Sequence, residues 1–306
     1  MTSASSAITY WNRASKKLET EKVYGDTLVR WLYGSRTGFR LADLFLVRPW
    51  LSKIVGAYQD TGVSSKRVPE FIRQYEIPMD QYEGADFSTF NDFFIRKFKS
   101  GMREFPQEAE VMGAPAEARY LGFDRITDQQ VFPVKGYGLS AVNLLGSRDV
   151  AKPFIGGPLL LARLCPVDYH RFHFPDDGRT LSQFRVPGRL HSVNPMALRA
   201  SDEVFIRNER QVAILQTQNF GRLAYVEVGA MCVGKIIQSS PEGQKDFRRG
   251  EEKGYFLFGG STVIVLGEPG AWAPDQDLLE QTAQGRECLV RLGEPVARAK
   301  APSPRT

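Results

Sequence analysis

The residues best suited to chemistry in this chain are a serine that follows two glycines and a small set of histidines. Ser261 comes directly after Gly259 and Gly260. Glycine adopts backbone conformations that other residues resist, and it leaves its carbonyl open to close approach. A tight bend could therefore aim the Ser261 hydroxyl at a carbonyl carbon, including that of its own peptide bond with Gly260. Because a serine hydroxyl is a weak nucleophile, this chemistry needs a base to take its proton.

The same string has a plainer interpretation, in which a turn enters a strand of the core. Glycine and serine dominate turns, and residues 261–266 form a run typical of a strand that is buried on both faces. A serine hydrolase is a further alternative. Its nucleophile elbow, however, has Gly-x-Ser-x-Gly ahead of a helix, whereas a strand follows here. Only the partners of Ser261 separate these interpretations.

The chain has three histidines, and two of them stand three positions apart. His170 and His173 belong to the string PVDYHRFHFP at 166–175. Side chains alternate along a regular strand, so the two rings would face opposite sides unless a bend lies between them. A zinc site would need further ligands, which no motif supplies. Two histidines so close to an aspartate and a tyrosine favour catalysis over purely structural roles.

Composition and charge narrow the class of protein. A length of 306 residues, with 42% hydrophobic and 25% charged residues, is ordinary for a globular protein of one or two domains. A net charge of +5 favours anionic partners, and the absence of any nucleic-acid motif argues against DNA or RNA. The longest apolar runs, such as 156–162, are too short to span a bilayer. Three widely spaced cysteines indicate neither a disulfide framework nor a zinc cluster.

The first 105 residues are predicted to form a helical region. Residues 26–58 combine apolar side chains, including two tryptophans, with five basic and two acidic residues. Short helices with an apolar and a basic face suit the surface of an anionic bilayer. The alternative is that this face packs on the catalytic core or on a second subunit. Four phenylalanines then recur at helical spacing, a stripe typical of a core: Phe87, Phe90, Phe94 and Phe98.

From residue 111 onward, short apolar runs broken by glycine and proline predict a β-rich domain. The expected strands are 120–123, 159–164, 204–207, 212–216, 225–228, 261–266 and 287–292, with a helix at 275–284. The predicted class is α+β: an N-terminal helical region, 1–105, followed by a β-rich catalytic domain of antiparallel or mixed sheets, 106–296. Residues 297–306 are expected to form a disordered tail.

Eight short strings, taken together, carry a resemblance to a known family. They are FNDFFIRK at 90–97, GAPA at 113–116, VKG at 134–136, DYHRFH at 168–173, SVNP at 192–195, VGA at 228–230, GEEKGYF at 250–256 and GGST at 259–262. In this order they closely resemble the phosphatidylserine decarboxylase proenzymes of bacterial type, a pyruvoyl-dependent family. The match runs from about residue 24 to residue 294, and the histidine and Gly-Ser-Thr strings are its most specific parts.

The resemblance implies that the chain cuts itself between Gly260 and Ser261. The serine attacks the Gly260 carbonyl, the peptide becomes an ester, and β-elimination leaves a pyruvoyl group, the covalent cofactor, in place of Ser261. The products are a chain of residues 1–260 and a pyruvoyl chain of residues 261–306. By position, His173 is the base in this step, oriented by an acid as in a hydrolase triad.

The orienting acid is the one clear departure from the family pattern. The family usually has aspartate in a Pro-Ala-Asp string, and this chain has Glu117 there. Glutamate serves the same purpose in some hydrolase triads, so we expect Glu117 to support maturation. The alternatives are that Asp168 or Asp124 takes this role, or that the proenzyme stays uncut and inactive.

The resemblance also implies the reaction of the mature enzyme. The pyruvoyl carbonyl forms a Schiff base with the amine of phosphatidylserine, and loss of carbon dioxide yields phosphatidylethanolamine. His170 is the residue expected to return a proton to the carbanion. The implied enzyme is a carboxy-lyase without a metal.

The expected partners follow from the substrate. Phosphatidylserine lies in an anionic membrane, the two self-cleaved chains stay together, and the family often forms homodimers. The expected location is therefore peripheral, at the cytoplasmic face of the inner cell membrane. Two rival functions are a serine hydrolase that uses Ser261 and His173, and a lipid-binding relative that does not mature.

Overall fold

The computed structural model describes most of the chain, including both predicted catalytic histidines. The described residues are 8–21, 49–84, 86–126, 131–132, 137–138, 140–191, 204–230, 235–240, 243–259 and 261–300. Several sequence features lie outside these ranges: the strings at 134–136 and 192–195, the basic segment 26–48, Cys232, Gly260 and the tail at 301–306.

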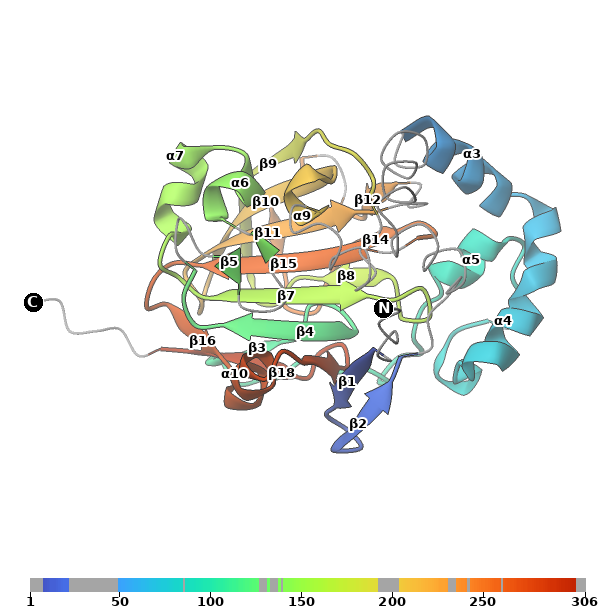
Figure 1. Ribbon diagram of the computed structural model, residues 1–306, viewed down its shortest axis with the longest axis horizontal. Coiled ribbons are helices and arrows are strands. Elements are labelled where there is room, and N and C mark those ends of the chain that lie inside the picture. Colours follow the sequence, from blue (N-terminus) through green and yellow to red (C-terminus); the bar gives the residue numbers. More distant parts are fainter. Residues whose placement is uncertain are drawn as a thin grey trace, which may run out of the picture.

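A ten-stranded sheet forms the body of the described structure (Figure 1). Its strands, in spatial order, are β13 (Asp246–Phe247), β9 (Gly178–Val186), β10 (Arg210–Thr217), β11 (Arg222–Gly229), β15 (Ser261–Gly267), β7 (Leu159–Leu164), β4 (Ala118–Phe123), β17 (Glu287–Val290), β1 (Thr9–Asn12) and β2 (Lys17–Thr20). Neighbours are antiparallel except β1 and β17, which are parallel. Strand β15 lies in the middle and is buried along its whole length, as its unbroken apolar run predicts.

Smaller sheets accompany the main one. Their strands are β12 (Ile236–Gln238), β14 (Glu252–Phe256) and β8 (Arg171–His173) in one sheet, β16 (Trp272–Pro274), β18 (Pro295–Ala299) and β3 (Val111–Gly113) in a second, and β5 (Val131–Phe132) with β6 (Tyr137–Gly138) in a third. The sheet that contains β8 packs on the main sheet through aromatic rings. Phe172 lies 4.8 Å from Phe256 and 6.2 Å from Tyr225 of β11, measured between ring centroids.

Helices gather at the end of the main sheet where β15 begins (Figure 1). They are α3 (Pro49–Gln59), η2 (Gly62–Arg67), α4 (Val68–Tyr75), η3 (Met79–Gln81) and α5 (Phe90–Phe94). The start of α5 is fixed by a capping box, in which the Thr89 side chain accepts the Asp92 N–H and the Asp92 carboxylate accepts the Thr89 N–H. This region brings α5 up to the histidine string. Within the described ranges, no helix is long and apolar enough to cross a bilayer.

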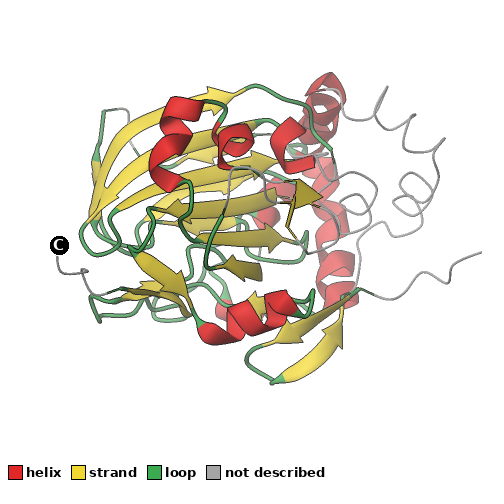
Figure 2. Ribbon diagram, turned by 60° about the vertical axis from the view of Figure 1, so that its left-hand side comes forward, coloured by secondary structure: helices red, strands yellow, loops and turns green. Residues whose placement is uncertain are grey.

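The remaining helices cover the main sheet elsewhere (Figure 2). They are α6 (Ala141–Leu145), α7 (Arg148–Ala151), η4 (Lys152–Phe154), α9 (Val204–Arg207) and α10 (Gln276–Ala283). Helix α10 packs against β4 and β17, and the Thr282 hydroxyl accepts the N–H of Gly122 in β4 (2.9 Å). The sequence predicts α10 correctly to within one residue at each end.

The buried side chains form two clusters. The larger one fills the space on the main sheet, and the smaller one joins the N-terminal helices to the histidine string. The members of the smaller cluster are Val68, Phe71, Ile77, Tyr82, Phe90, Phe93, Phe94, Tyr169, Phe258 and Leu292. Phe90 and Phe94 are fully buried, and Phe87 and Phe98 are partly buried against them. The predicted phenylalanine stripe is therefore core, as expected.

The α+β class is confirmed, with more strand than helix. Three local predictions are wrong. Residues 9–20 form a hairpin whose first strand pairs with β17 rather than a helix. Residues 204–207 form helix α9, because so short an apolar run fits either element. Residues 297–299 belong to β18 rather than to a tail, because they pair with β3 and β16.

Candidate active site

Ser261 begins β15, and its hydroxyl faces the ring of His170. The Oγ atom lies 3.3 Å from Nδ1 of His170, and both residues are fully buried. The other ring nitrogen, Nε2, lies 2.9 Å from the Cys165 carbonyl oxygen. A carbonyl only accepts hydrogen bonds, so Nε2 carries the proton and Nδ1 is left as an acceptor. The geometry therefore suits transfer of the Ser261 proton to His170.

The environment keeps the His170 ring neutral. The ring stacks on that of Phe94, with centroids 3.8 Å apart and planes inclined by 21°. Burial, and secondly the positive charge of Arg96, lower the pKa of His170 to about 3, whereas the Cys165 carbonyl raises it. At physiological pH the ring is thus an uncharged acceptor, which is the form a general base must have.

The turn that carries His170 is held from two sides. The Asp168 carboxylate accepts the Cys165 N–H and a guanidinium N–H of Arg119, each at 2.6 Å. Arg96 donates through Nη2 to the carbonyl oxygens of Val167 (2.9 Å) and Asp168 (3.1 Å). These contacts place the Cys165 carbonyl where it meets Nε2 of His170. Asp168, one of the alternative orienting acids, thus braces the turn, and within the described ranges its carboxylate bonds to Arg119 and Cys165 rather than to a histidine ring.

His173 lies in β8 and has other partners. Its Nδ1 is 2.9 Å from the Gly250 carbonyl oxygen, and its Nε2 is 3.4 Å from the Tyr169 hydroxyl. Burial lowers its pKa, and the hydrogen bond to Gly250 opposes that shift. No hydrogen bond joins His173 to Ser261 in the described part of the chain. The turn at 166–168 comes before His170, and residues 171–173 form strand β8, so no turn separates the two histidines. Their rings have different neighbours, as alternation along an extended backbone predicts.

Glu117 also has a partner other than a histidine. Its carboxylate accepts hydrogen bonds from Arg103, at 2.6 Å from Nε and 3.1 Å from Nη2, and from the Leu292 N–H at 3.2 Å. The string nevertheless runs beside His173, whose N–H donates to the Pro115 carbonyl (2.8 Å). Asp124, the remaining alternative acid, pairs with Lys300 (3.2 Å) near the surface. The roles assigned to Glu117 and His173 by resemblance stay predictions.

Two contributors to this site escape sequence reasoning. The Cys165 carbonyl sets the tautomer of His170, but every residue has a carbonyl, so no motif marks it. The sequence places Arg96 beside an aromatic stripe but does not indicate that it holds the histidine turn. Its guanidinium lies over the rings of Tyr82 (4.5 Å) and Phe93 (4.9 Å), which is how a buried arginine cation is accommodated here.

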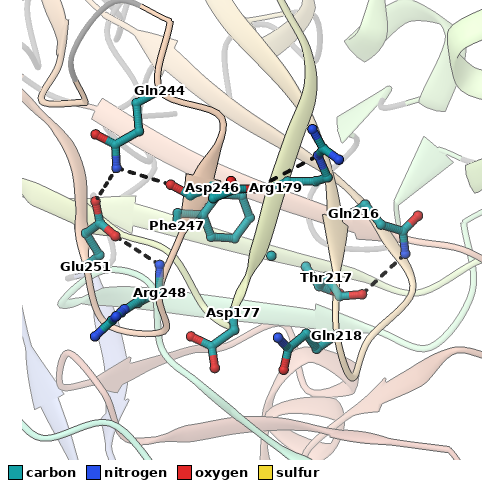
Figure 3. A pocket seen from close by; sticks show the side chains of 11 residues that line it. Asp177, Arg179, Gln216, Thr217, Gln218, Gln244, Asp246, Phe247, Arg248 and Glu251 are labelled. Carbon is teal, nitrogen blue, oxygen red and sulfur yellow. Dashed lines mark hydrogen bonds and ion pairs between the residues drawn. The ribbon is translucent and has the colours of Figure 1, made fainter.

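A separate cavity of about 790 Å³ lies elsewhere on the main sheet (Figure 3). Polar and charged residues line most of it: Asp177, Gly178, Arg179, Gln216, Thr217, Gln218, Gln244, Asp246, Phe247, Arg248 and Glu251. In the sheet, Ser261 pairs with Gly229, whereas Gln216 pairs with Arg222 at the opposite end of β11. At about 3.3 Å per residue, these two ends lie about 20 Å apart along the strand. The cavity is therefore not the Ser261 site.

Comparison with known proteins shows which family the chain resembles. The family model described as phosphatidylserine decarboxylase matches residues 90–298. The chain is 38% identical over 295 residues to the phosphatidylserine decarboxylase proenzyme of Clostridium botulinum (strain Kyoto / Type A2), covering 96% of this chain and 100% of the relative. It is 39% identical over 291 residues to that of Clostridium kluyveri, covering 94% and 98%. It is 37% identical over 293 residues to that of Clostridium tetani, covering 95% of this chain and 98% of the relative. The chain belongs to the phosphatidylserine decarboxylase family.

Proposed function

We propose that this protein decarboxylates phosphatidylserine to phosphatidylethanolamine and carbon dioxide, through a pyruvoyl group that it makes from its own Ser261. The observation that carries the proposal is the contact between the Ser261 hydroxyl and the neutral His170 ring at the start of β15. In a chain of this family, that contact joins a nucleophile to a base at the expected cleavage position.

Self-cleavage begins when Nδ1 of His170 takes the hydroxyl proton and Oγ of Ser261 attacks the Gly260 carbonyl carbon. The C–N bond then breaks, the amine of Ser261 takes a proton, and the peptide has become an ester. Loss of the Ser261 Cα proton expels the Gly260 carboxylate and leaves dehydroalanine. Water adds to its imine form and ammonia leaves, so that a pyruvoyl group heads the chain 261–306.

The resemblance favours a different base for this step. It assigns the proton transfer to His173, oriented by Glu117, and reserves His170 for the later protonation of the carbanion. The contacts around Ser261 favour His170 for the first step and also leave it beside residue 261 for the second. The two assignments differ in which histidine is the base for self-cleavage. Variants of His170 and His173 distinguish them.

The surroundings of Ser261 fit a pyruvoyl group. Such a group supplies a carbonyl that accepts the electron pair left when a carboxylate departs as carbon dioxide. Ser261 is fully buried, and the Phe94 ring that stacks on His170 also contacts the Phe258 ring, with centroids 5.2 Å apart. Such burial keeps water away from a reacting group. His170 holds its Nε2 proton on the Cys165 carbonyl and presents Nδ1 to position 261. After Nδ1 has taken up a proton that comes from water, it can pass that proton to the reacting carbon.

The N-terminal region is proposed to contact the membrane that holds the substrate. Ile54 and Tyr58 are exposed apolar residues one turn apart on α3, and Val63 in η2 is exposed as well. An apolar edge on a chain of net charge +5 suits an anionic bilayer. The proposed location is peripheral, at the cytoplasmic face of the inner membrane. A homodimer is proposed from the resemblance, and a boundary near residue 105 is proposed from the sequence.

Intact-mass measurement of freshly made protein tests the proposal. We expect two chains, 1–260 and 261–306, the smaller with a blocked N-terminus and a carbonyl that borohydride reduces. The Ser261→Ala variant should remain one chain and release no carbon dioxide from phosphatidylserine vesicles. An uncut chain with esterase activity would favour the hydrolase, and vesicle binding without carbon dioxide release would favour the lipid-binding relative.

A further inference from the structure

Helix α5 contacts both the proposed base and the segment that leads into Ser261. On one side, Phe94 stacks on His170. On the other, the side chain of Asn91 reaches the segment that leads into Ser261: its Oδ1 accepts the backbone N–H of Phe258 at 2.9 Å. Asn91 is 3% exposed, and Phe258 is 6% exposed. One short helix therefore holds the base and the approach to the nucleophile at the same time.

The orientation of the Asn91 amide is set by a second contact. Its Nδ2 donates to Oδ1 of Asp60 at 2.7 Å, just beyond the end of α3. A carboxylate accepts hydrogen bonds and does not donate them, so the nitrogen of the amide must face Asp60 and the oxygen must face Phe258. The link Asp60–Asn91–Phe258 is thus a directed chain of hydrogen bonds from the end of α3 to the segment before Ser261.

The segment before Ser261 is also rich in glycine. Phe258 is followed by Gly259, whose φ of 144° lies in a region that residues with side chains rarely adopt. Glycine has the largest conformational freedom to lose on ordering, so two glycines before Ser261 make the approach of a carbonyl to Oγ improbable without a tether. The Phe258 ring adds edge contacts to Phe90 and Phe94, each with centroids 5.2 Å apart.

We propose that Asn91 is a positioning residue for self-cleavage, which it promotes by tethering the Phe258 N–H so that the Gly260–Ser261 peptide meets the Ser261 hydroxyl. This inference rests on the proposed function and assigns a role within it. An intramolecular attack requires the reacting atoms to lie about 3–3.5 Å apart, and a displacement of about 1 Å can cost about 100-fold in rate. After cleavage the tether holds only the new C-terminal segment, so the rate of decarboxylation per pyruvoyl group depends on it much less.

The test measures how fast the full-length chain, made in a cell-free system, converts into two chains. Asn91→Ala should cleave about 10- to 100-fold more slowly. Asn91→Asp keeps an acceptor for the Phe258 N–H but places a second carboxylate beside that of Asp60. The two negative charges repel each other, so this variant should also cleave slowly. The double variant Asp60→Asn with Asn91→Asp exchanges the two partners, retains both hydrogen bonds and should recover the parent rate to within about 3-fold.

The matched control is Thr89→Ala, which removes the capping hydroxyl of α5 and leaves the Asn91 contacts in place. It should cleave within about 3-fold of the parent chain. Folding is checked on the Ser261→Ala background, where every variant is one uncut chain and melting temperatures are comparable. Hydroxylamine, which cleaves an accumulated ester, should not accelerate Asn91→Ala, because the tether acts before the ester forms.

Three outcomes would overturn the inference: parent-like cleavage of Asn91→Ala, a Thr89→Ala variant as slow as Asn91→Ala, or no recovery in the exchanged pair. Failure of the unaltered chain to cleave at all would instead overturn the proposed function itself. Once matured by long incubation, Asn91→Ala should decarboxylate phosphatidylserine within about 3-fold of the parent per pyruvoyl group. A loss there equal to the loss in cleavage rate would indicate a general structural role.

Discussion

Phe94 and His170 lie face to face, with ring centroids 3.8 Å apart and both side chains fully buried. They come from different parts of the fold, a short N-terminal helix and the turn before β8. The stack fixes the plane of the imidazole while the Cys165 carbonyl fixes its rotation. Together they hold Nδ1 toward Ser261, so the position of the proposed base depends on a contact between two segments 76 positions apart.

Replacing Phe94 with leucine should slow self-cleavage by about 10-fold, because the imidazole loses the flat surface that sets its plane. The free energy of unfolding should fall by only about 1–2 kcal/mol, since leucine fills much of the same volume. Gel analysis of cleavage and denaturant unfolding of the uncut Ser261→Ala chain measure the two effects. Phe93→Leu is the matched control, because Phe93 is equally buried but does not stack on His170; an equal slowing there would contradict the proposed role of the stack.

Alanine at His170 should slow self-cleavage by about 100- to 10,000-fold, the usual contribution of a general base. Alanine at His173 should slow it by less than about 10-fold, because that ring bonds to Gly250 and Tyr169 rather than to Ser261. The measurement is the fraction of cut chain with time, before any substrate is added. The reverse order of the two rates would support His173 as the base, in line with the resemblance.

The depressed pKa of His170 predicts a pH dependence of stability. The folded protein keeps the ring neutral down to about pH 3, whereas the unfolded chain protonates it below about pH 6.5. This contribution to stability is therefore complete above pH 6.5 and is lost as the pH falls toward 3, by about 1.4 kcal/mol per pH unit.

Unfolding of Ser261→Ala and of Ser261→Ala with His170→Asn, from pH 7 to pH 4.5, isolates this effect. The first should lose about 2–3 kcal/mol more than the second over this range. His173 is present in both chains, so its own contribution cancels. If the free energy of unfolding fell equally with pH in both chains, His170 would not be held neutral by burial.

Glu117→Gln should leave the rate of self-cleavage within about 3-fold of the parent, because the Glu117 carboxylate is engaged by Arg103 rather than by a histidine. The variant should lose about 1–3 kcal/mol of stability through the weakened pair. Arg103→Gln should lose a similar amount, and the double variant should lose less than the sum of the two. A loss of cleavage on the scale of a missing general base would instead restore Glu117 as the orienting acid.

Glu21→Gln should destabilise the uncut chain by about 3–5 kcal/mol, because it leaves two buried arginines without their shared carboxylate. Glu21 accepts Nη2 of Arg163 at 2.6 Å and pairs with Arg119 at 3.1 Å. Burial would raise the pKa of Glu21, but Arg163 and then Arg119 lower it to about 2.

The Glu21 contribution is thus present above about pH 4.5 and is lost as the pH falls toward 2. Urea unfolding at pH 7 and at pH 3 measures it. Glu19→Gln on the same hairpin is the control and should cost less than about 1 kcal/mol. Among the described residues, Glu19 is hydrogen-bonded to Tyr10, Asn12 and Ser15 near the surface. Equal losses in the two variants would contradict a special role for the buried pair.

Much of this protein was determined by its sequence alone, wherever local pattern and burial agree. The apolar run at 261–266 predicts a strand buried on both faces, the phenylalanines at 87–98 predict a core stripe, and the structure confirms both. The strings around the histidines and Ser261 identify the family, because their residue types and order are so specific. The local pattern gave the wrong element at 204–207, where the run is too short to distinguish helix from strand. It also gave the wrong element at 9–20, where pairing with β17 makes the segment a strand.

The tertiary structure alone decided which groups meet. Ser261 and His170 are 91 positions apart, and nothing in either string tells which of the two nearby histidines will face the serine. The Cys165 carbonyl is a backbone group, and the Asn91 side chain bonds to the backbone N–H of Phe258. Backbone groups have no signature in a sequence, so neither contact could be foreseen. Glu117 illustrates the same limit, since a carboxylate goes to whichever cation the fold places beside it, and here that cation is Arg103.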